Sequence, residues 1–260
     1  MCEYLPSQPS GDVVVWHHGS PHSGALIDPV IAAAELRGIR MVTYARPSYG
    51  GSTQLPNRDI ASCAGDGAAV ADGLGIDRFA VVGYSGGAPH ALACAALLPD
   101  RVGAAVTLAG PAPYRSDVDW FAGMATDVAL RTSLEGRDAR AALPDAFEPD
   151  CFVDTDWTAL ADAWSSLGED AGRAGEAWPD GLVEDDVALV RPWGFDLGVI
   201  SCPVLVVHGR RDRMIPVSHA QWLTDQIPTA ELWLRPLDGH VAVLTGLGVA
   251  LDWIRESSGP

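Results

Sequence analysis

The chain has 260 residues and a mass of 27.3 kDa, enough for one large domain or two small ones. Apolar residues make up 48% and charged residues 20%, which excludes a disordered chain and a coiled coil. The 34 acidic residues outnumber 17 basic ones, and the net charge of −17 makes nucleic acid and anionic membranes poor partners. Every basic residue is arginine, and without lysine the chain has neither Schiff-base chemistry nor a Walker-type phosphate loop.

The cysteines are odd in number, widely spaced and form no CxxC pair; they are Cys2, Cys63, Cys94, Cys151 and Cys202. We therefore expect neither a disulfide framework nor a zinc site. Residues 1–11 lack a basic stretch followed by an apolar run, and no segment approaches about 18 apolar residues in a row. These patterns predict a soluble, cytoplasmic protein.

Predicted strands and helices alternate up to residue 110. Short apolar runs predict strands at residues 13–16, 41–44, 79–82 and 102–108. Helical patterns fill the intervals, at residues 25–37, 59–74 and 88–98. Such alternation predicts βαβ crossovers and a parallel sheet, whose ligands bind at the carboxyl ends of the strands.

The alternation stops between residues 111 and 198, which read as several helices and loops rich in Trp and Asp. This segment holds 19 acidic and six basic residues, a net charge of −13, against −4 for the rest of the chain. Strands at 204–207 and 230–234 and helices at 217–227 and 241–255 then follow. Most connections have about 2–6 residues. We therefore predict a core of residues 1–110 and 199–260 with a helical cap at 111–198.

A G-x-S-x-G pattern centred on Ser85 lies between a predicted strand and a predicted helix. This strand, sharp turn and helix is the context in which such a motif presents a nucleophile. Gly83 and Gly87 remove the Cβ atoms that would obstruct the turn, so the hydroxyl can stand at its tip. We interpret Ser85 as a nucleophile, although glycine-rich turns with a serine also join strands to helices without catalysis.

A serine hydroxyl needs a base, and the base needs an orienting group. Asp212 and His240 each follow a predicted strand, which gives the chain order Ser, acid, His. A loop His can instead cap a helix, and a loop Asp is often a turn residue. The ordered trio at strand ends favours a triad of Ser85, Asp212 and His240. Asp238 is too close to His240 in sequence to orient it, and we expect it to shape the turn.

The loop after the first predicted strand supplies a further element. Acyl transfer needs two backbone N–H donors at the oxyanion, one from the residue after the nucleophile and one from this loop. We therefore predict an oxyanion hole formed by Gly86 and Ser20. His17, His18 and His22 are expected to be structural, because no carboxylate partner accompanies them at metal-ligand spacing.

At these residues the sequence resembles the α/β-hydrolase superfamily. The matching segments cover nearly the whole chain outside the cap: His18-Gly19-Ser20-Pro21, Arg46-Pro47-Ser48-Tyr49-Gly50-Gly51-Ser52, Gly83-Tyr84-Ser85-Gly86-Gly87, Asp212 running into Met214-Ile215-Pro216, and Asp238-Gly239-His240. The resemblance implies an α/β fold with a mostly parallel sheet of about eight strands, flanked by helices, and a cap after the sixth strand. The antiparallel hairpin that usually opens the family is expected to be truncated here to a remnant near residues 3–5.

The predicted reaction is hydrolysis of a carboxylic ester or lactone through an acyl-enzyme. Ser at position 85 argues against the haloalkane dehalogenases and main epoxide hydrolases of the family, which attack with Asp. No cofactor and no metal are expected, and the partner is a small-molecule substrate of a monomer or homodimer. Three alternatives use the same triad, namely C–C bond hydrolysis, perhydrolysis and acyl transfer. A fourth is a non-catalytic small-molecule receptor on this fold.

The aromatic residues of the cap allow two interpretations. Most are expected to pack the cap against the sheet, namely Trp120, Phe121, Trp157, Trp164 and Trp178. Part of an apolar inner face must also line the cavity beneath a cap, and the candidate substrate contacts are Tyr84, Trp120, Trp157 and Trp164. We expect a small to medium, apolar and non-anionic substrate. The acidity of the cap either steers such substrates or only keeps an apolar cap in solution.

Overall fold

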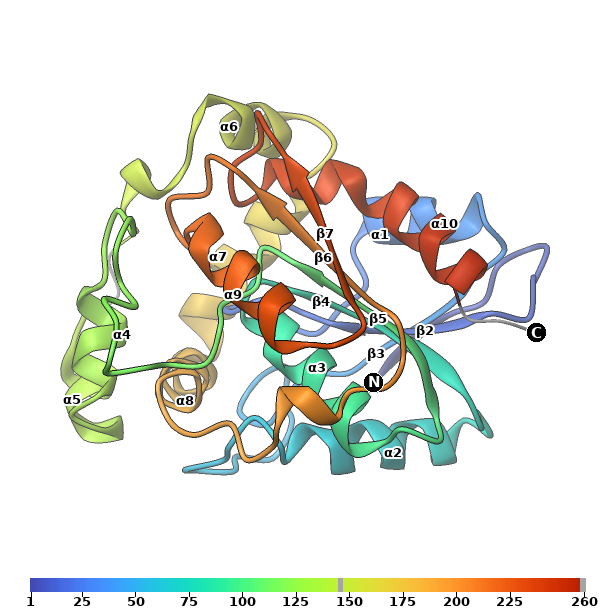
Figure 1. Cartoon of the computed structure of the whole chain (residues 1–260), viewed down its shortest axis with the longest axis horizontal. Helices are drawn as coiled ribbons and strands as arrows, with labels where there is room; N and C mark the ends of the chain where they lie inside the picture. Colours follow the sequence, from blue (N-terminus) through green and yellow to red (C-terminus); the bar gives the residue numbers. More distant parts are fainter. Residues whose placement is uncertain (145–146, 258–260) are drawn as a thin grey trace.

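The structure is a computed structural model that describes residues 1–144 and 147–257. Its centre is a seven-stranded sheet with the order β1-β3-β2-β4-β5-β6-β7 (Figure 1). The strands are β1 (Cys2–Tyr4), β2 (Val13–His17), β3 (Arg40–Thr43), β4 (Phe79–Tyr84), β5 (Val102–Leu108), β6 (Val204–Gly209) and β7 (Ala230–Arg235). β2 to β7 pair in parallel, and β1 pairs antiparallel to β3.

The predicted mostly parallel sheet is confirmed, but its strand count and the position of the cap differ from expectation. The described residues form seven strands rather than about eight, because the opening hairpin is reduced to β1. This strand overlaps the remnant expected near residues 3–5. For the same reason the helical segment 111–198 follows the fifth strand of this chain, β5, and not the sixth.

Helices cover both faces of the sheet. Those of the core are α1 (Asp28–Glu35), α2 (Cys63–Gly73), α3 (Ala88–Leu97), α9 (Val217–Gln226) and α10 (Leu247–Ser257), with short 3-10 turns η1 (Ser85–Gly87) and η4 (Ala242–Gly246). In Figure 1, α1 and α10 lie on one side of the sheet and α2 and α3 on the other. The apolar residues of α9 join the cluster of α2 and α3. The sheet is therefore buried between two apolar layers.

Several helices are shorter than their sequence patterns. The helix predicted from residue 25 begins at Asp28, because Pro29 in the first turn favours a helix start there. The helix predicted from residue 59 begins at Cys63, and the residues before it form turns. The last predicted helix is divided into η4 and α10. The later helix starts do not change where the strands end. The loops that follow the parallel strands therefore still lie at one edge of the sheet.

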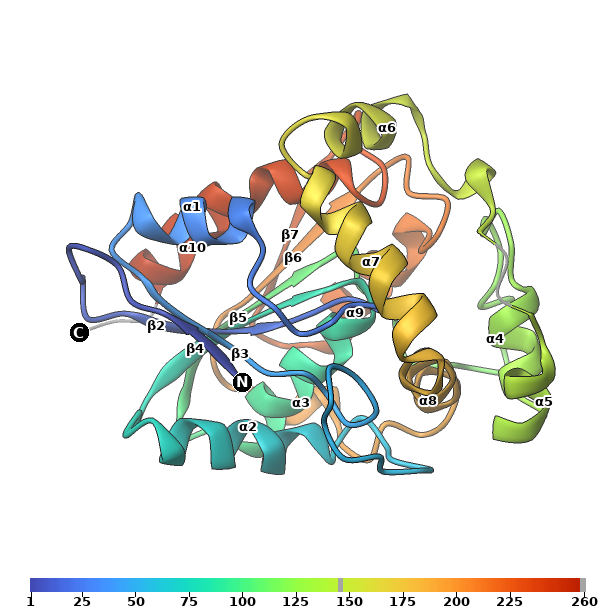
Figure 2. The same cartoon turned by 180° about the vertical axis from the view of Figure 1, so that it is seen from behind.

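The cap segment, residues 111–198, contains α4 (Val128–Ser133), α5 (Arg137–Ala142), η2 (Pro149–Cys151), α6 (Asp154–Ala161), α7 (Ser165–Ala177), α8 (Pro179–Leu189) and η3 (Leu197–Val199). Figure 2 shows α6, α7 and α8 near the carboxyl edge of the sheet, with α4 and α5 farther out. α4 and α5 pack on each other and on α8. Among the described residues, no helix has the length and apolar character that a membrane span requires.

Candidate active site

Ser85 occupies a sharp turn between β4 and α3. Its φ of +51° lies in the left-handed region, which a non-glycine residue adopts only when its surroundings require it. A Cβ on Gly83 would lie 2.4 Å from the carbonyl oxygen of Gly87, and one on Gly87 would lie 2.1 Å from that of His17. Both positions therefore need glycine for a steric reason, and the turn presents the Ser85 side chain above the end of β4.

The predicted trio is brought together from three separate loops. Oγ of Ser85 lies 2.9 Å from Nε2 of His240, and Nδ1 of His240 lies 2.8 Å from Oδ2 of Asp212. A carboxylate only accepts hydrogen bonds, so Nδ1 of His240 carries the proton and Nε2 is left as an acceptor. The Ser85 hydroxyl then donates to His240, which is the arrangement that a general base requires.

Asp212 is held by the turn that follows β6. Its Oδ1 accepts hydrogen bonds from the backbone amides of Met214, at 2.9 Å, and Ile215, at 2.8 Å. Asp238, the alternative acid, is instead paired with Arg235, and its carbonyl accepts from the amide of Arg211. The turn-shaping role predicted for Asp238 therefore agrees with its contacts.

The two predicted oxyanion donors lie next to each other. A Cβ on Gly86 would lie 2.4 Å from Oγ of Ser20 and 3.6 Å from its backbone nitrogen. His18 supports this loop, because its Nε2 accepts from the amide of Arg46 at 3.2 Å and its Nδ1 contacts the carbonyl oxygen of Gly19 at 2.7 Å. Burial and the adjacent Arg46 hold the pKa of His18 well below its ordinary value, so the imidazole is neutral.

A buried ionic cluster lies behind the Ser20 loop. Asp185 of α8 accepts from Nη2 of Arg46 at 2.6 Å, from the Tyr49 hydroxyl at 2.9 Å, and also from Arg58 and the Ser20 hydroxyl. Burial would raise the pKa of Asp185, but the two guanidiniums hold it well below its ordinary value. Both arginines and the carboxylate are almost fully buried, so this is a desolvated charge cluster and not a surface pair.

His90 connects this cluster to the turn of Ser85. Its Nε2 lies 3.3 Å from Nη1 of Arg58, and its Nδ1 lies 2.9 Å from the carbonyl oxygen of Gly86. Since a guanidinium only donates, Nε2 accepts and Nδ1 donates to Gly86. Burial and then the charge of Arg46 lower the pKa of His90 to about 3, which keeps the ring neutral.

The aromatic candidates for substrate contact lie in different surroundings. Tyr84 is buried, and its ring centroid lies 5.4 Å from that of His240. The ring centroid of Trp120 lies 4.7 Å from that of His219. Trp164 is buried in the apolar layer that contains α1 and α10. Trp157 is 42% exposed and stacks with aromatic neighbours within the cap, so it does not pack the cap against the sheet. The buried residues of α6 are Asp156 and Ala159, and Trp157 is not among them.

One group among the described residues has metal-ligand chemistry. The ligand atoms of His17, Cys63 and Cys94 lie within 4.8 Å of one another, a convergence that the sequence analysis did not expect. Sγ of Cys63 lies 3.6 Å from Nδ1 of His17 and 2.9 Å from the Tyr44 hydroxyl, and Sγ of Cys94 lies 3.7 Å from Nε2 of His17. The two thiols contact different nitrogens of the His17 ring, an arrangement that suits hydrogen bonds between thiols and an imidazole. A single ion would bind only one of those nitrogens.

Comparisons with known proteins identify the fold. The sequence pattern described as alpha/beta hydrolase fold matches residues 12–130. A bromoperoxidase from Bacillus anthracis superimposes with a TM-score of 0.76 at 24% identity, over 98% of this chain and 95% of that one. The chain has the α/β-hydrolase fold.

Two curated relatives match this chain over most of their length. A pimeloyl-[acyl-carrier protein] methyl ester esterase from Nitrosomonas europaea is 29% identical over 239 residues, 90% of each chain. A 2-hydroxy-6-oxo-6-phenylhexa-2,4-dienoate hydrolase from Burkholderia cepacia is 27% identical over 244 residues, 88% of this chain and 81% of the relative. The first relative is named as an esterase and the second as a hydrolase.

Sequence reasoning missed the buried cluster of Arg46, Arg58, His90 and Asp185. Arg46 lies in the segment Arg46-Pro47-Ser48-Tyr49-Gly50-Gly51-Ser52, which resembles the α/β hydrolases, but the sequence alone indicates no role for it. Asp185 is 139 residues from Arg46 and 165 from Ser20 along the chain, and no local pattern reports such a contact. The only available signal was the excess of acidic residues in the cap.

Proposed function

We propose that this protein is a serine hydrolase that cleaves a carboxylic ester or lactone through an acyl-enzyme. The observation that carries the proposal is the continuous hydrogen-bonded chain Ser85, His240, Asp212 at 2.9 and 2.8 Å. The methyl ester esterase among its relatives supports the same class of reaction.

In the proposed mechanism, Oγ of Ser85 attacks the substrate carbonyl while Nε2 of His240 takes its proton. The tetrahedral oxyanion is stabilised by the backbone N–H groups of Ser20 and Gly86. The imidazolium then returns the proton to the leaving alcohol, and Asp212 stabilises the imidazolium without being protonated itself. A water molecule, deprotonated by His240, attacks the acyl-enzyme and releases the carboxylic acid and Ser85.

The decisive experiment compares wild type with Ser85→Ala on p-nitrophenyl esters. We expect the wild type to hydrolyse at least one ester and Ser85→Ala to lose about 10⁴-fold or more in kcat. Ser133→Ala is a matched control, because Ser133 is also buried but its hydroxyl donates to the carbonyl oxygen of Ala129 within α4. Equal turnover by Ser85→Ala and Ser133→Ala would refute the assignment.

A fluorophosphonate probe separates an enzyme from a receptor on the same fold. The wild type and Ser133→Ala should be labelled, and Ser85→Ala should not. A folded wild type that neither reacts with the probe nor hydrolyses any ester would support a non-catalytic receptor instead.

C–C bond hydrolysis is the second candidate. The substrate named for the Burkholderia cepacia relative carries a ketone and no ester, so its hydrolysis must break a C–C bond. A vinylogous diketone assayed beside the esters distinguishes the two reactions by their kcat/KM values. Perhydrolysis and acyl transfer are tested in the same assay by adding peroxide or an alcohol as the acceptor.

The substrate that we propose is small to medium, apolar and non-anionic. Ser85 is only 9% exposed, and the indole of Trp164 and the ring of Tyr84 belong to the apolar layer near it. Burial of the nucleophile favours substrates with an apolar acyl group, because charged groups are costly to desolvate. Acetyl, butyryl and octanoyl esters test chain length. A cytoplasmic location and a monomeric or homodimeric state stay predictions from the sequence.

A further inference from the structure

Three cap helices each place one buried carboxylate against a loop of the candidate active site. Asp156 comes from α6, Asp170 from α7 and Asp185 from α8, and each is at most 2% exposed. We propose that these three residues are positioning residues, through which the cap fixes the geometry of the His240 loop, the oxyanion loop and the turn of Ser85. The proposal rests on the proposed serine hydrolase function, and it assigns the cap a role in the chemical step.

Asp156 holds the backbone beside His240. Its Oδ1 accepts from the amides of Val241 and Ala242, both at 2.8 Å, and its Oδ2 accepts from the amide of Val153 at 3.0 Å. A Cβ on Gly239 would lie 2.0 Å from Oδ2, so the carboxylate occupies the space that glycine leaves open. One side chain from the cap thus binds the two residues that follow His240 and lies against Gly239, which precedes it.

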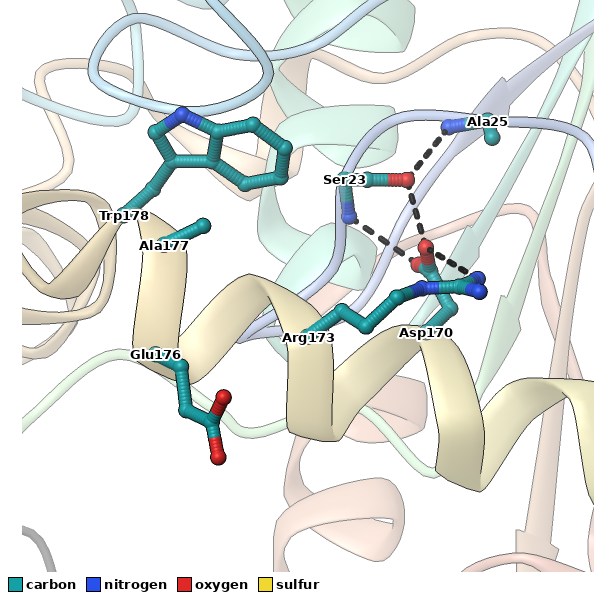
Figure 3. A pocket seen from close by; sticks show the side chains of 7 residues that line it. All are labelled: Ser23, Ala25, Asp170, Arg173, Glu176, Ala177 and Trp178. Carbon is teal, nitrogen blue, oxygen red and sulfur yellow. Dashed lines mark hydrogen bonds and ion pairs between the residues drawn. The ribbon is translucent and has the colours of Figure 1, made fainter.

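Asp170 holds the oxyanion loop from the outside. It accepts from the amide of Ser23 at 3.0 Å, from the Ser23 hydroxyl at 2.5 Å and from Nδ1 of His22 at 3.1 Å. Figure 3 shows Asp170 reaching from α7 to Ser23 at the edge of a pocket of about 530 Å³, with Arg173 beside it. Burial raises the pKa of Asp170, but the hydrogen bonds from His22 and Ser23 outweigh it and lower the pKa to about 2. The residue is therefore an anion at neutral pH.

Asp185 holds the same loop from the inside. Besides binding the Ser20 hydroxyl, it orients Arg46, whose Nη2 donates to the carbonyl oxygen of Gly19 at 3.1 Å. Through Arg58 and His90 it also reaches the carbonyl oxygen of Gly86. The peptide unit that carries the Ser20 donor, and the carbonyl group of the residue that carries the Gly86 donor, are therefore linked to one carboxylate of α8. A shift of these donors away from the developing oxyanion lowers its stabilisation.

The test compares Asp156→Ala, Asp170→Ala and Asp185→Ala with Glu184→Ala as the matched control. Glu184 is equally buried in α8, but it binds Arg137 and the amide of Asn57. We expect kcat on the best ester to fall about 10- to 100-fold in the three Asp variants, with KM within about threefold, and to stay within about threefold in the control. The Ki of an alkyl boronic acid, which imitates the tetrahedral state, should rise in proportion to the loss of kcat/KM.

Conservative variants separate positioning from loss of folding. Asp156→Asn keeps one acceptor oxygen for Val241 and Ala242 and should recover most of the activity that Asp156→Ala loses. Asp185→Asn replaces Asp185→Ala if the alanine variant fails to fold, and should show the same loss of kcat. Folded Asp variants that match Glu184→Ala in kcat and Ki would overturn the proposal.

Hydrogen exchange gives a readout that does not depend on turnover. In Asp156→Ala the amides of Val241 and Ala242 should exchange at least about tenfold faster than in Glu184→Ala, because their acceptor is gone. Equal exchange would overturn the positioning role even if the wild type hydrolysed no ester. An inactive wild type with faster exchange in Asp156→Ala would instead refute the proposed function alone.

Discussion

Asp212 binds His240 through one carboxylate oxygen and the backbone of its own turn through the other. The 2.8 Å contact with Nδ1 uses Oδ2, while Oδ1 accepts two amides. The carboxylate thus has a fixed orientation before any proton moves, and its role can be tested without disturbing the turn.

Asp212→Asn should lower kcat by about 10⁴-fold while the fold is kept. The asparagine oxygen can replace Oδ1 at the amides of Met214 and Ile215, so its NH₂ group faces His240. An NH₂ donor forces Nδ1 to accept, which places the ring proton on Nε2 and removes the base for Ser85. Ester kinetics and circular dichroism measure the two effects. A loss below about tenfold would contradict the proposed role.

Gly87→Ala should destabilise the protein and abolish ester hydrolysis, because its Cβ would meet the carbonyl oxygens of His17 and His18 at 2.1 and 2.4 Å. Gly172→Ala is the matched change within α7, where a Cβ would have nothing within 4 Å. There alanine should raise the free energy of unfolding by about 0.5–1 kcal/mol. Urea denaturation of both variants checks the pair, and equal stability for the two would be inconsistent with the steric argument.

Acidification should destabilise the protein through His90. Burial and the charge of Arg46 lower the pKa of this group to about 3, against an ordinary value of 6.5 for histidine. Between these values the unfolded chain binds a proton that the folded chain does not, so stability falls as pH drops from 6.5 toward 3. The contribution is at most about 5 kcal/mol.

His90→Gln isolates this contribution. A glutamine can donate to Gly86 and accept from Arg58 but does not titrate in this range. Urea denaturation at pH 7 and pH 4 should show a smaller loss of stability for His90→Gln than for wild type. The same loss in both proteins would assign the acid sensitivity to other groups.

The native protein should react with a disulfide reagent at one thiol per chain and at five after denaturation. Cys2 is exposed, whereas Cys63, Cys94, Cys151 and Cys202 are buried and reduced. Cys2→Ser should remove the native reaction. A fast-reacting thiol that remains in that variant would show that at least one of the four buried cysteines becomes accessible to solvent.

The charge of the cap predicts an effect of salt on substrate preference. If its field steers substrates, kcat/KM for a cationic ester should fall with added salt while that for a neutral analogue should not. Equal responses would leave the exposed acidic residues with a role in solubility alone. Asp185 adds no negative charge to such a field, because Arg46 and Arg58 pair with it.

Much of the fold and of the candidate site could be predicted from the sequence, because the patterns that indicate them involve residues close together in the chain. The apolar runs that became β2 to β7 are continuous, and the glycines around Ser85 reflect contacts within a few residues. Asp212 and His240 could be placed because parallel strands end at one edge. The partners of the cap carboxylates could not, because an Asp that faces solvent and one that faces a buried Arg have the same local sequence pattern.

The contacts that α6, α7 and α8 make with the loops beneath them also limit how this chain can be recombined. A chimera that exchanged residues 111–198 for the segment of a relative would remove Asp185 and leave Arg46 and Arg58 buried without a carboxylate, which is strongly destabilising. Residues 111–144 are tied to α8 in the same way, because Arg140 of α5 pairs with Asp186 and Arg137 pairs with Glu184. An exchange of any part of the cap therefore has to keep both partners of each buried ion pair.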